Sequence, residues 1–118
     1  MTPMRRPDDK LAIVRGTLDV LILQSVLAGR RHGFEISLWL DNQSGGQLAL
    51  EDSALYQALH RLEARRLLKS EWGVSDNNRR ARYYRITPAG RAALASDRAR
   101  LVSYARTITA MLTSTRPK

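Results

Sequence analysis

The sequence predicts a small α+β fold that is mainly helical, with a single β-hairpin and a long last helix. Three observations support this prediction. Apolar residues recur at helical spacing in three early segments, two extended runs flank a turn-rich segment, and a helix start at Thr87-Pro88 opens a pattern that stays helical to about Thr113. At 118 residues the chain is long enough for one compact domain with a single core.

The chain is expected to begin with a poorly structured segment. Residues 1–15 combine prolines with charged side chains, so we expect an arm that becomes helical near Lys10. Thr17 is expected to cap the first core helix, because its hydroxyl can accept a backbone hydrogen bond. The apolar face of this helix is broad and ends before Gly29.

Two further helices are expected before the hairpin. A turn at residues 29–33 leads to the second helix, which we expect to stop within the turn-forming cluster at 42–46. The third helix is expected to run from the acidic and hydroxyl residues at 51–53 to about Arg65. One of its faces is apolar at i, i+3, i+4 and i+7 spacing and is predicted to be buried: Leu55, Ala58, Leu59 and Leu62.

The opposite face of the third helix carries hydrogen-bonding groups, one cation and no carboxylate: Ser53, Tyr56, Gln57, His60 and Arg61. Such groups suit insertion between the phosphates of a DNA groove. Gln57 fits an adenine edge, and Arg61 fits a guanine edge or a phosphate. Exposed helix faces are polar in most proteins, so this face alone leaves DNA contact and ordinary solvation equally open.

The hairpin favours DNA contact. Extended runs at residues 67–74 and 81–87 flank its turn, and eight Lys or Arg residues between positions 61 and 85 stand against three acidic ones. The hairpin residues that we expect to reach a minor groove or its flanking phosphates are Asn78, Arg79, Arg80 and Arg82. Together with the helices, the hairpin predicts a winged helix-turn-helix over residues 16–87, in which the hairpin is the wing. A merely solvated basic turn is the alternative for its tip.

The last helix, expected over residues 88–113, presents one long apolar face. It is formed by Leu94, Leu101, Tyr104, Ala105, Ile108, Met111 and Leu112. We expect this face to pair with a second copy, giving a homodimer whose recognition helices enter successive major grooves about 34 Å apart on a near-palindromic site. Packing back on its own domain is the alternative. Residues 114–118 are expected to form a disordered tail.

Charge and composition restrict the partners. The formal net charge of +9 indicates attraction to a polyanion, either nucleic acid or an anionic membrane. A membrane is disfavoured, because no apolar run reaches the ~20 residues needed to span it and no signal-peptide pattern opens the chain. The absence of cysteine fits a reducing compartment, and we expect the cytoplasm. Double-stranded DNA is therefore the expected partner.

No pattern in the sequence indicates catalysis. We find no convincing paired carboxylates, Ser/His/Asp arrangement, glycine-rich phosphate loop or metal-ligand cluster, so we expect no enzyme activity, metal or cofactor. The rival hypothesis is a winged helix that binds a protein partner through Trp39, Tyr56 and Trp72. Salt distinguishes the two, because DNA binding weakens steeply as ionic strength rises.

Four ordered motifs resemble the PadR family of bacterial transcriptional regulators, in its short form with a single C-terminal helix: GTLDVLIL at 16–23, HGFEI at 32–36, ALYQALHRLE at 54–63 and RYYRITPAG at 82–90. The resemblance implies a winged helix-turn-helix, a homodimer held by the last helix, and repression that a small aromatic or drug-like effector relieves. It also implies a cavity for this hydrophobic effector, lined by Ile13, Leu101 and Ala105. Two residues depart from the family pattern: Gln57 stands where proline or a small residue is usual, and Arg66 where glycine ends the recognition helix.

Overall fold

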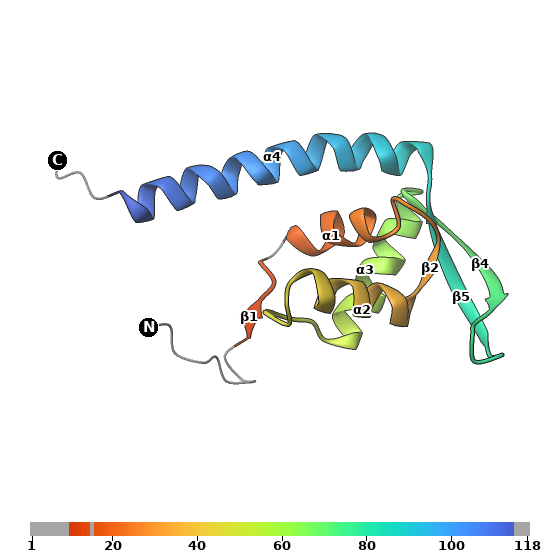
Figure 1. The fold of residues 1–118 in the computed structure, drawn as a ribbon. Helices are drawn as coiled ribbons and strands as arrows, with labels where there is room; N and C mark the ends of the chain where they lie inside the picture. Colours follow the sequence, from red (N-terminus) through yellow and green to blue (C-terminus); the bar gives the residue numbers. More distant parts are fainter. Residues whose placement is uncertain (1–9, 15, 115–118) are drawn as a thin grey trace.

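Four helices and five strands make up the described part of the chain, residues 10–14 and 16–114 of a computed structural model (Figure 1). In chain order they are β1 (Leu11–Ala12), α1 (Thr17–Ser25), β2 (Arg31–His32), α2 (Gly33–Gln43), β3 (Leu48–Ala49), α3 (Asp52–Ala64), β4 (Leu68–Val74), β5 (Arg80–Ile86) and α4 (Pro88–Thr113). The mainly helical α+β fold with one hairpin and a long last helix is confirmed. The arm over residues 1–9 and the tail over 115–118 lie outside the described residues.

The segment before α1 is extended and not helical. β1 pairs in parallel with β3, with Leu11 opposite Leu48. The Leu11 amide donates a hydrogen bond to the Gln47 carbonyl oxygen at 2.7 Å. The expectation that the arm becomes helical near Lys10 is therefore wrong. Instead, the backbone N–H and C=O groups of this segment form hydrogen bonds in a short β-ladder with β3.

The first helix begins after a glycine and has no hydroxyl cap. Gly16 occupies the N-cap position with a φ of 89°, and no side chain caps the helix there. Thr17 is the first residue of α1, so its predicted capping role is wrong. The physical reason is the positive φ, which glycine adopts at little cost and a β-branched residue does not.

The hairpin belongs to a three-stranded antiparallel sheet in the order β2-β5-β4. β2 lies within residues 29–33, where only a turn was predicted, and His32 pairs with Tyr83 of β5. His32 also caps α2. Its Nδ1 accepts a hydrogen bond from the Glu35 amide at 3.3 Å, while the Glu35 carboxylate accepts one from the His32 amide at 3.0 Å. The start of α2 is thereby fixed against the hairpin.

The core lies between the first three helices, the base of the hairpin and the start of α4. The predicted stripe on α3 is buried, since none of its four residues is more than 1% exposed. They pack with other buried apolar side chains, among them Ile22, Leu23, Val26, Ile36, Leu40, Leu68, Tyr84 and Leu94. Burial of this stripe determines which face of α3 points outward.

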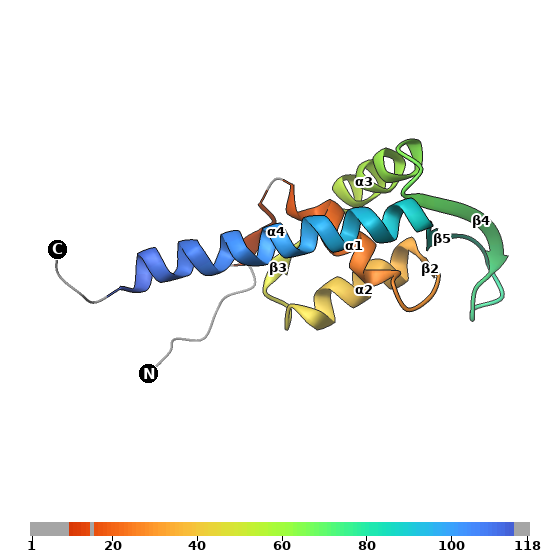
Figure 2. The ribbon, with the colours of Figure 1, turned by 90° about the horizontal axis from the view of Figure 1, so that it is seen from above.

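The start of α4 matches the prediction. Thr87 Oγ1 accepts a hydrogen bond from the Gly90 amide at 3.0 Å, and Pro88 opens the helix. Gly90 passes close to the base of the hairpin, because a Cβ at this position would lie 2.1 Å from the Leu67 carbonyl oxygen. α4 then crosses over α1 and continues beyond the other helices (Figures 1 and 2). None of the described helices combines the length and the apolar character needed to cross a membrane.

Candidate nucleic-acid interface

The outward face of α3 carries all the residues predicted to contact DNA from this helix. Ser53, Tyr56, Gln57, His60 and Arg61 are exposed, while the opposite stripe is buried. The division of the helix into a core face and an open face is therefore confirmed. The exposed α3 side chains can donate and accept hydrogen bonds, so they can pair with base edges and with phosphates.

Arg61 differs from its neighbours because it is tied to another helix. Its Nη2 donates a hydrogen bond to Oδ1 of Asp19 in α1 at 2.7 Å. The Asp19 carboxylate thus partly offsets the charge of Arg61 and links α3 to the first turn of α1. Arg61 remains about half exposed, so this is a surface ion pair of modest strength.

A groove separates α3 from the wing, the β4–β5 hairpin with its turn (residues 68–86). Its volume is about 950 Å³, and Tyr56 and His60 line it from α3. The Tyr56 ring packs closely on Gly33, which also lines the groove, because a Cβ at Gly33 would lie only 3.1 Å from the Tyr56 hydroxyl. The opposite wall comes from the wing and includes Trp72, Arg79, Arg80 and Arg82. The structure therefore brings together predicted residues from both elements.

The turn of the wing has a local reason for its asparagine. Asn78 has a φ of 59°, and its amide donates a hydrogen bond to the Ser75 carbonyl oxygen at 2.8 Å. The Ser75 amide in turn donates to the Arg79 carbonyl oxygen at 2.8 Å. Asparagine tolerates this left-handed conformation better than most residues. Asn78 thus shapes the turn that presents the exposed Arg79.

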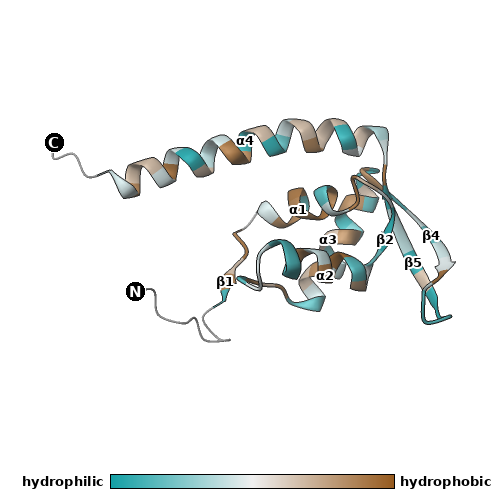
Figure 3. Ribbon diagram, viewed as in Figure 1, coloured by the Kyte–Doolittle hydropathy of each residue, from teal (hydrophilic) through white to brown (hydrophobic). Residues whose placement is uncertain are grey.

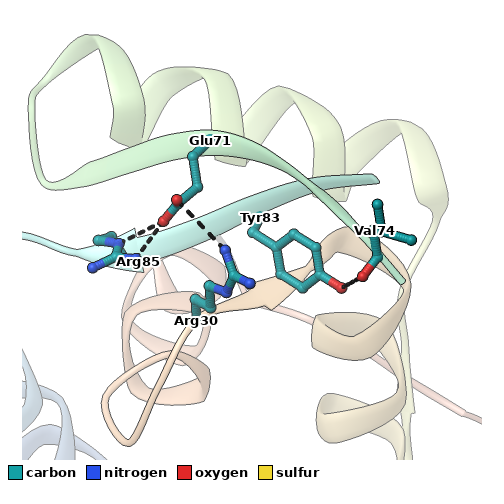
Figure 4. Close-up of polar contacts among 5 residues, drawn as sticks. All are labelled: Arg30, Glu71, Val74, Tyr83 and Arg85. Atoms are coloured by element: carbon teal, nitrogen blue, oxygen red, sulfur yellow. Dashed lines mark hydrogen bonds and ion pairs between the residues drawn. The ribbon is translucent and has the colours of Figure 1, made fainter. Parts of the chain in front are cut away.

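Ion pairs between Glu71 and two arginines lie on one face of the wing (Figure 4). Glu71 accepts hydrogen bonds from Arg85, and its carboxylate lies 3.5 Å from Nη1 of Arg30. The hydrogen bond from Arg85, together with the nearby positive charges, holds the pKa of Glu71 below its usual value against the opposing effect of desolvation. Tyr83 completes this face by donating from its hydroxyl to the Val74 carbonyl oxygen at 3.2 Å. Arg85, one of the predicted basic block, therefore stabilises the hairpin.

The predicted dimerisation residues fall into two groups. Leu94 lies in the core of its own domain at 1% exposed, and Leu101 packs partly against this core. Farther along α4 the apolar side chains face solvent, with Tyr104 at 64%, Met111 at 70% and Leu112 at 80% exposed. Ala105 is also exposed and Ile108 is half-buried. Figure 3 shows apolar residues recurring along this overhanging part of the helix.

The residues predicted for an effector cavity do not line one groove. Ile13 lines a groove of about 620 Å³ between the segment before α1 and the start of α3. Gln57 and Arg61 line the same groove, whereas Leu101 and Ala105 do not. Among the described residues, no three His, Cys, Asp or Glu side chains are grouped so that they could hold a metal ion.

Comparison with known proteins decides the family. Residues 22–96 match the transcriptional regulator PadR-like family, a span that contains α2, α3 and the whole wing. This chain belongs to the PadR-like family. Its members are regulators of transcription that bind DNA and are generally not enzymes.

Relatives and solved structures agree with this assignment. The transcriptional regulator Rv3488 of Mycobacterium tuberculosis is 45% identical over 78 residues, which cover 66% of this PadR-like chain and 59% of that protein. Uncharacterized protein X of Lysinibacillus sphaericus is 39% identical over 83 residues, or 70% of this chain and 75% of that one. A transcriptional regulator from Clostridium thermocellum superposes with a TM-score of 0.72 at 27% identity, covering 85% of this chain and 93% of that one. A PadR family regulator from Eggerthella lenta gives 0.69 at 27% identity, with 86% of each chain covered.

Two acidic residues that pair with arginines of this candidate interface were not found from the sequence. Asp19 holds Arg61 from a position 42 residues away, and Glu63 meets Arg82 of the wing from 19 residues away. Both acids lie within segments that were expected to be helical, and no periodicity marks a carboxylate that pairs across the fold. Only the tertiary arrangement identifies them.

Proposed function

We propose that this PadR-like chain is a homodimeric transcriptional repressor that binds a near-palindromic operator in double-stranded DNA. The observation that carries the proposal is the groove between α3 and the wing. Its walls bring Tyr56 and His60 of the recognition helix to face the three predicted arginines of the wing. A DNA backbone that passes between a recognition helix and a wing meets cations from one side and hydrogen-bonding groups from the other.

The charge distribution supports phosphate contact at this face. Arg79 and Arg80 are exposed, and among the described residues neither forms an ion pair. By contrast, Arg85 on the other face of the wing is paired with Glu71. Within the described residues, the tip of the wing therefore carries two unpaired arginines beside one carboxylate, Asp76, where the flanking phosphates of a bound helix would be.

The overhang of α4 supports a second copy as partner. Tyr104, Met111 and Leu112 are more than half exposed, and an exposed apolar face of this length marks an interaction surface. We place the same face of a second subunit against it, because two-fold pairing is the commonest closed arrangement. The pairing also gives two recognition helices, which fits two half-sites of an operator.

For release by a small hydrophobic effector, which the family resemblance implies, we propose a site that both subunits complete. Ile13 lines a groove that includes neither Leu101 nor Ala105. In the proposed dimer, a cavity containing all three would have walls from both subunits.

The test is binding of the purified protein to labelled double-stranded fragments that span its own promoter. It is done at low and near-physiological salt with random DNA as competitor. Tight binding that resists the competitor, weakens with salt and saturates at two subunits per site supports the proposal. Repression is then measured by transcription of a reporter from the bound promoter, and a rise in transcription on adding the protein contradicts the repressor assignment.

One observation favours a second candidate, a winged helix that binds a protein. Phe34 and Leu38 on α2 are 67% and 45% exposed beside the groove. Wholly non-specific DNA binding, together with a protein complex that survives high salt, would shift the assignment to this candidate.

A further inference from the structure

We propose that Trp72 is a positioning residue for DNA binding, which holds the Arg80 guanidinium at the groove between α3 and the wing, and that Arg82 is a brace between the two elements. This inference rests on the proposed DNA binding. The sequence predicted the same role for Arg80 and Arg82. This inference gives them different roles: Arg80 contacts a phosphate, and Arg82 holds the wing against α3.

The register of the hairpin puts these residues on one face. Trp72 of β4 lies opposite Arg82 of β5, and Val74 lies opposite Arg80. Side chains two apart on a strand point to the same side, so these four residues share the face that continues to Tyr84. Tyr84 is 6% exposed and anchors this face to the core, whereas Trp72 is 55% exposed. Burial in the core therefore does not account for the indole.

The indole instead provides a surface for a cation. The guanidinium carbon of Arg80 lies 4.3 Å from the centroid of the Trp72 ring. Such a stack restricts the arginine side chain but leaves its charge uncompensated, because the partner is a neutral ring. Within the described part of the chain, no carboxylate forms an ion pair with Arg80.

Arg82 meets a different environment on the same face. Its Nε donates a hydrogen bond to Ser70 Oγ at 2.9 Å, and its Nη2 lies 3.4 Å from Oε2 of Glu63 in α3. Ser70 Oγ also donates to this carboxylate. The Trp72 ring is farther away, with its centroid 5.6 Å from the guanidinium carbon. The charge of Arg82 is thus already matched, and its contacts join the wing to the recognition helix.

Arg80 and Arg82 both line the groove that Tyr56 and His60 line from α3, but of these two arginines only Arg80 forms no ion pair within the described residues. A phosphate in this groove would meet a guanidinium whose rotamer is already selected by the indole. Pre-orientation of this kind raises affinity without adding a charge, so its signature differs from that of removing a cation.

The experiment measures DNA affinity as a function of salt for single variants of the full chain, with the promoter fragment as probe. Arg80→Ala is expected to reduce the slope of log affinity against log salt by about one phosphate contact. Arg82→Ala is expected to keep the slope while lowering Tm and, modestly, the affinity. Trp72→Ala is expected to weaken binding about two- to fivefold at every salt concentration with the slope unchanged, and Trp72→Phe to recover part of this loss. Arg85→Ala, on the ion-paired face of the same hairpin, is the matched control and keeps the slope.

A second measurement separates this inference from the proposed function. In a Trp39→Phe background, Trp72 is the only tryptophan, since the chain contains two. Arg80→Ala should then increase quenching of its fluorescence by acrylamide, and Arg82→Ala should do so less. If the unmodified protein binds no DNA, the proposed function and this inference both fail. If DNA is bound but Arg82→Ala loses the slope while Arg80→Ala keeps it, or Trp72 quenching is the same with and without Arg80, this inference alone is overturned.

Discussion

Arg66 occupies a backbone position that ordinarily favours glycine. Its φ is 60°, just after α3 ends at Ala64. The turn around it satisfies the end of the helix, because the Leu67 amide donates to the Leu62 carbonyl oxygen and the Arg66 amide donates to that of Glu63, both at 2.9 Å. The departure from the family's usual glycine therefore leaves the helix terminus in place, at the expense of a strained residue.

Arg66→Gly is expected to stabilise the protein by about 0.5–1 kcal/mol, because relief of the left-handed conformation outweighs the extra freedom that glycine gains in the unfolded chain. Urea unfolding of the variant and the parent measures the difference. Arg66→Ala is the control, since it removes the same charge but keeps the strain, and it should give no such gain. Equal stabilisation by both variants would contradict the backbone explanation.

Glu71 gives a pH dependence whose direction follows from its lowered pKa. The native carboxyl releases its proton at lower pH than the unfolded one, so the stabilisation by Arg85 and Arg30 is complete above the unfolded pKa of about 4.5. It is lost as pH falls through that value and then through the lower native one. Glu71→Gln should therefore lose less stability than the parent between about pH 5 and pH 3. Urea unfolding at several pH values measures this. In an Arg85→Ala background the difference should shrink, and an undiminished difference would assign the effect to another group.

At the scale of elements, the periodicity of apolar residues predicted the long helices and the hairpin, whose patterns lie within one continuous stretch of sequence. α3, the hairpin and α4 repeat their pattern over many residues, and their bounds agree closely with the expected ones. β1 and β2 were missed because each contains two residues, too few for any period, and because each pairs with a strand far along the chain. The same distance hides the ion pair between Asp19 and Arg61. Exposed faces could be predicted, whereas the partners of the charges on them could not.

The recognition helix and the wing should contribute differently to DNA recognition. Gln57 lies on the outward face of α3, where an amide can pair with a base edge, whereas Arg79 lies at the exposed tip of the wing. Gln57→Ala should change the sequence selected from a random DNA library, removing about 1–3 kcal/mol of discrimination at one base pair. Arg79→Ala should leave the selected sequence unchanged while weakening all binding and reducing the salt slope by about one. Equal losses at all sequences for both variants would refute this division.

For the whole molecule, α4 lies in two different environments along its length. In its first turns, Gly90 and Leu94 are part of the core. In its last turns, Tyr104, Met111 and Leu112 are exposed and are not covered by any other described part of the subunit. Changes in the last turns should therefore affect assembly without unfolding the domain. The start of α4 offers no such separation, since Leu94 is fully buried.

The double variant Tyr104→Lys/Met111→Lys is expected to be monomeric and folded, because both side chains are exposed in one subunit and lie seven residues apart on one side of α4. Ser103→Lys/Ala110→Lys is the matched control. It adds the same charge with the same spacing on the exposed side of the helix that lies opposite Leu101 and Ile108, and it should remain dimeric. Light scattering gives the mass, and circular dichroism checks the fold. On the full promoter site the monomeric variant should lose about a hundredfold or more in affinity, because two linked half-sites bind far more tightly than one. On a single half-site both variants should bind alike, since neither change touches α3 or the wing. A monomeric variant that keeps full affinity for the complete site would show that a single subunit suffices and that the overhang of α4 has another partner.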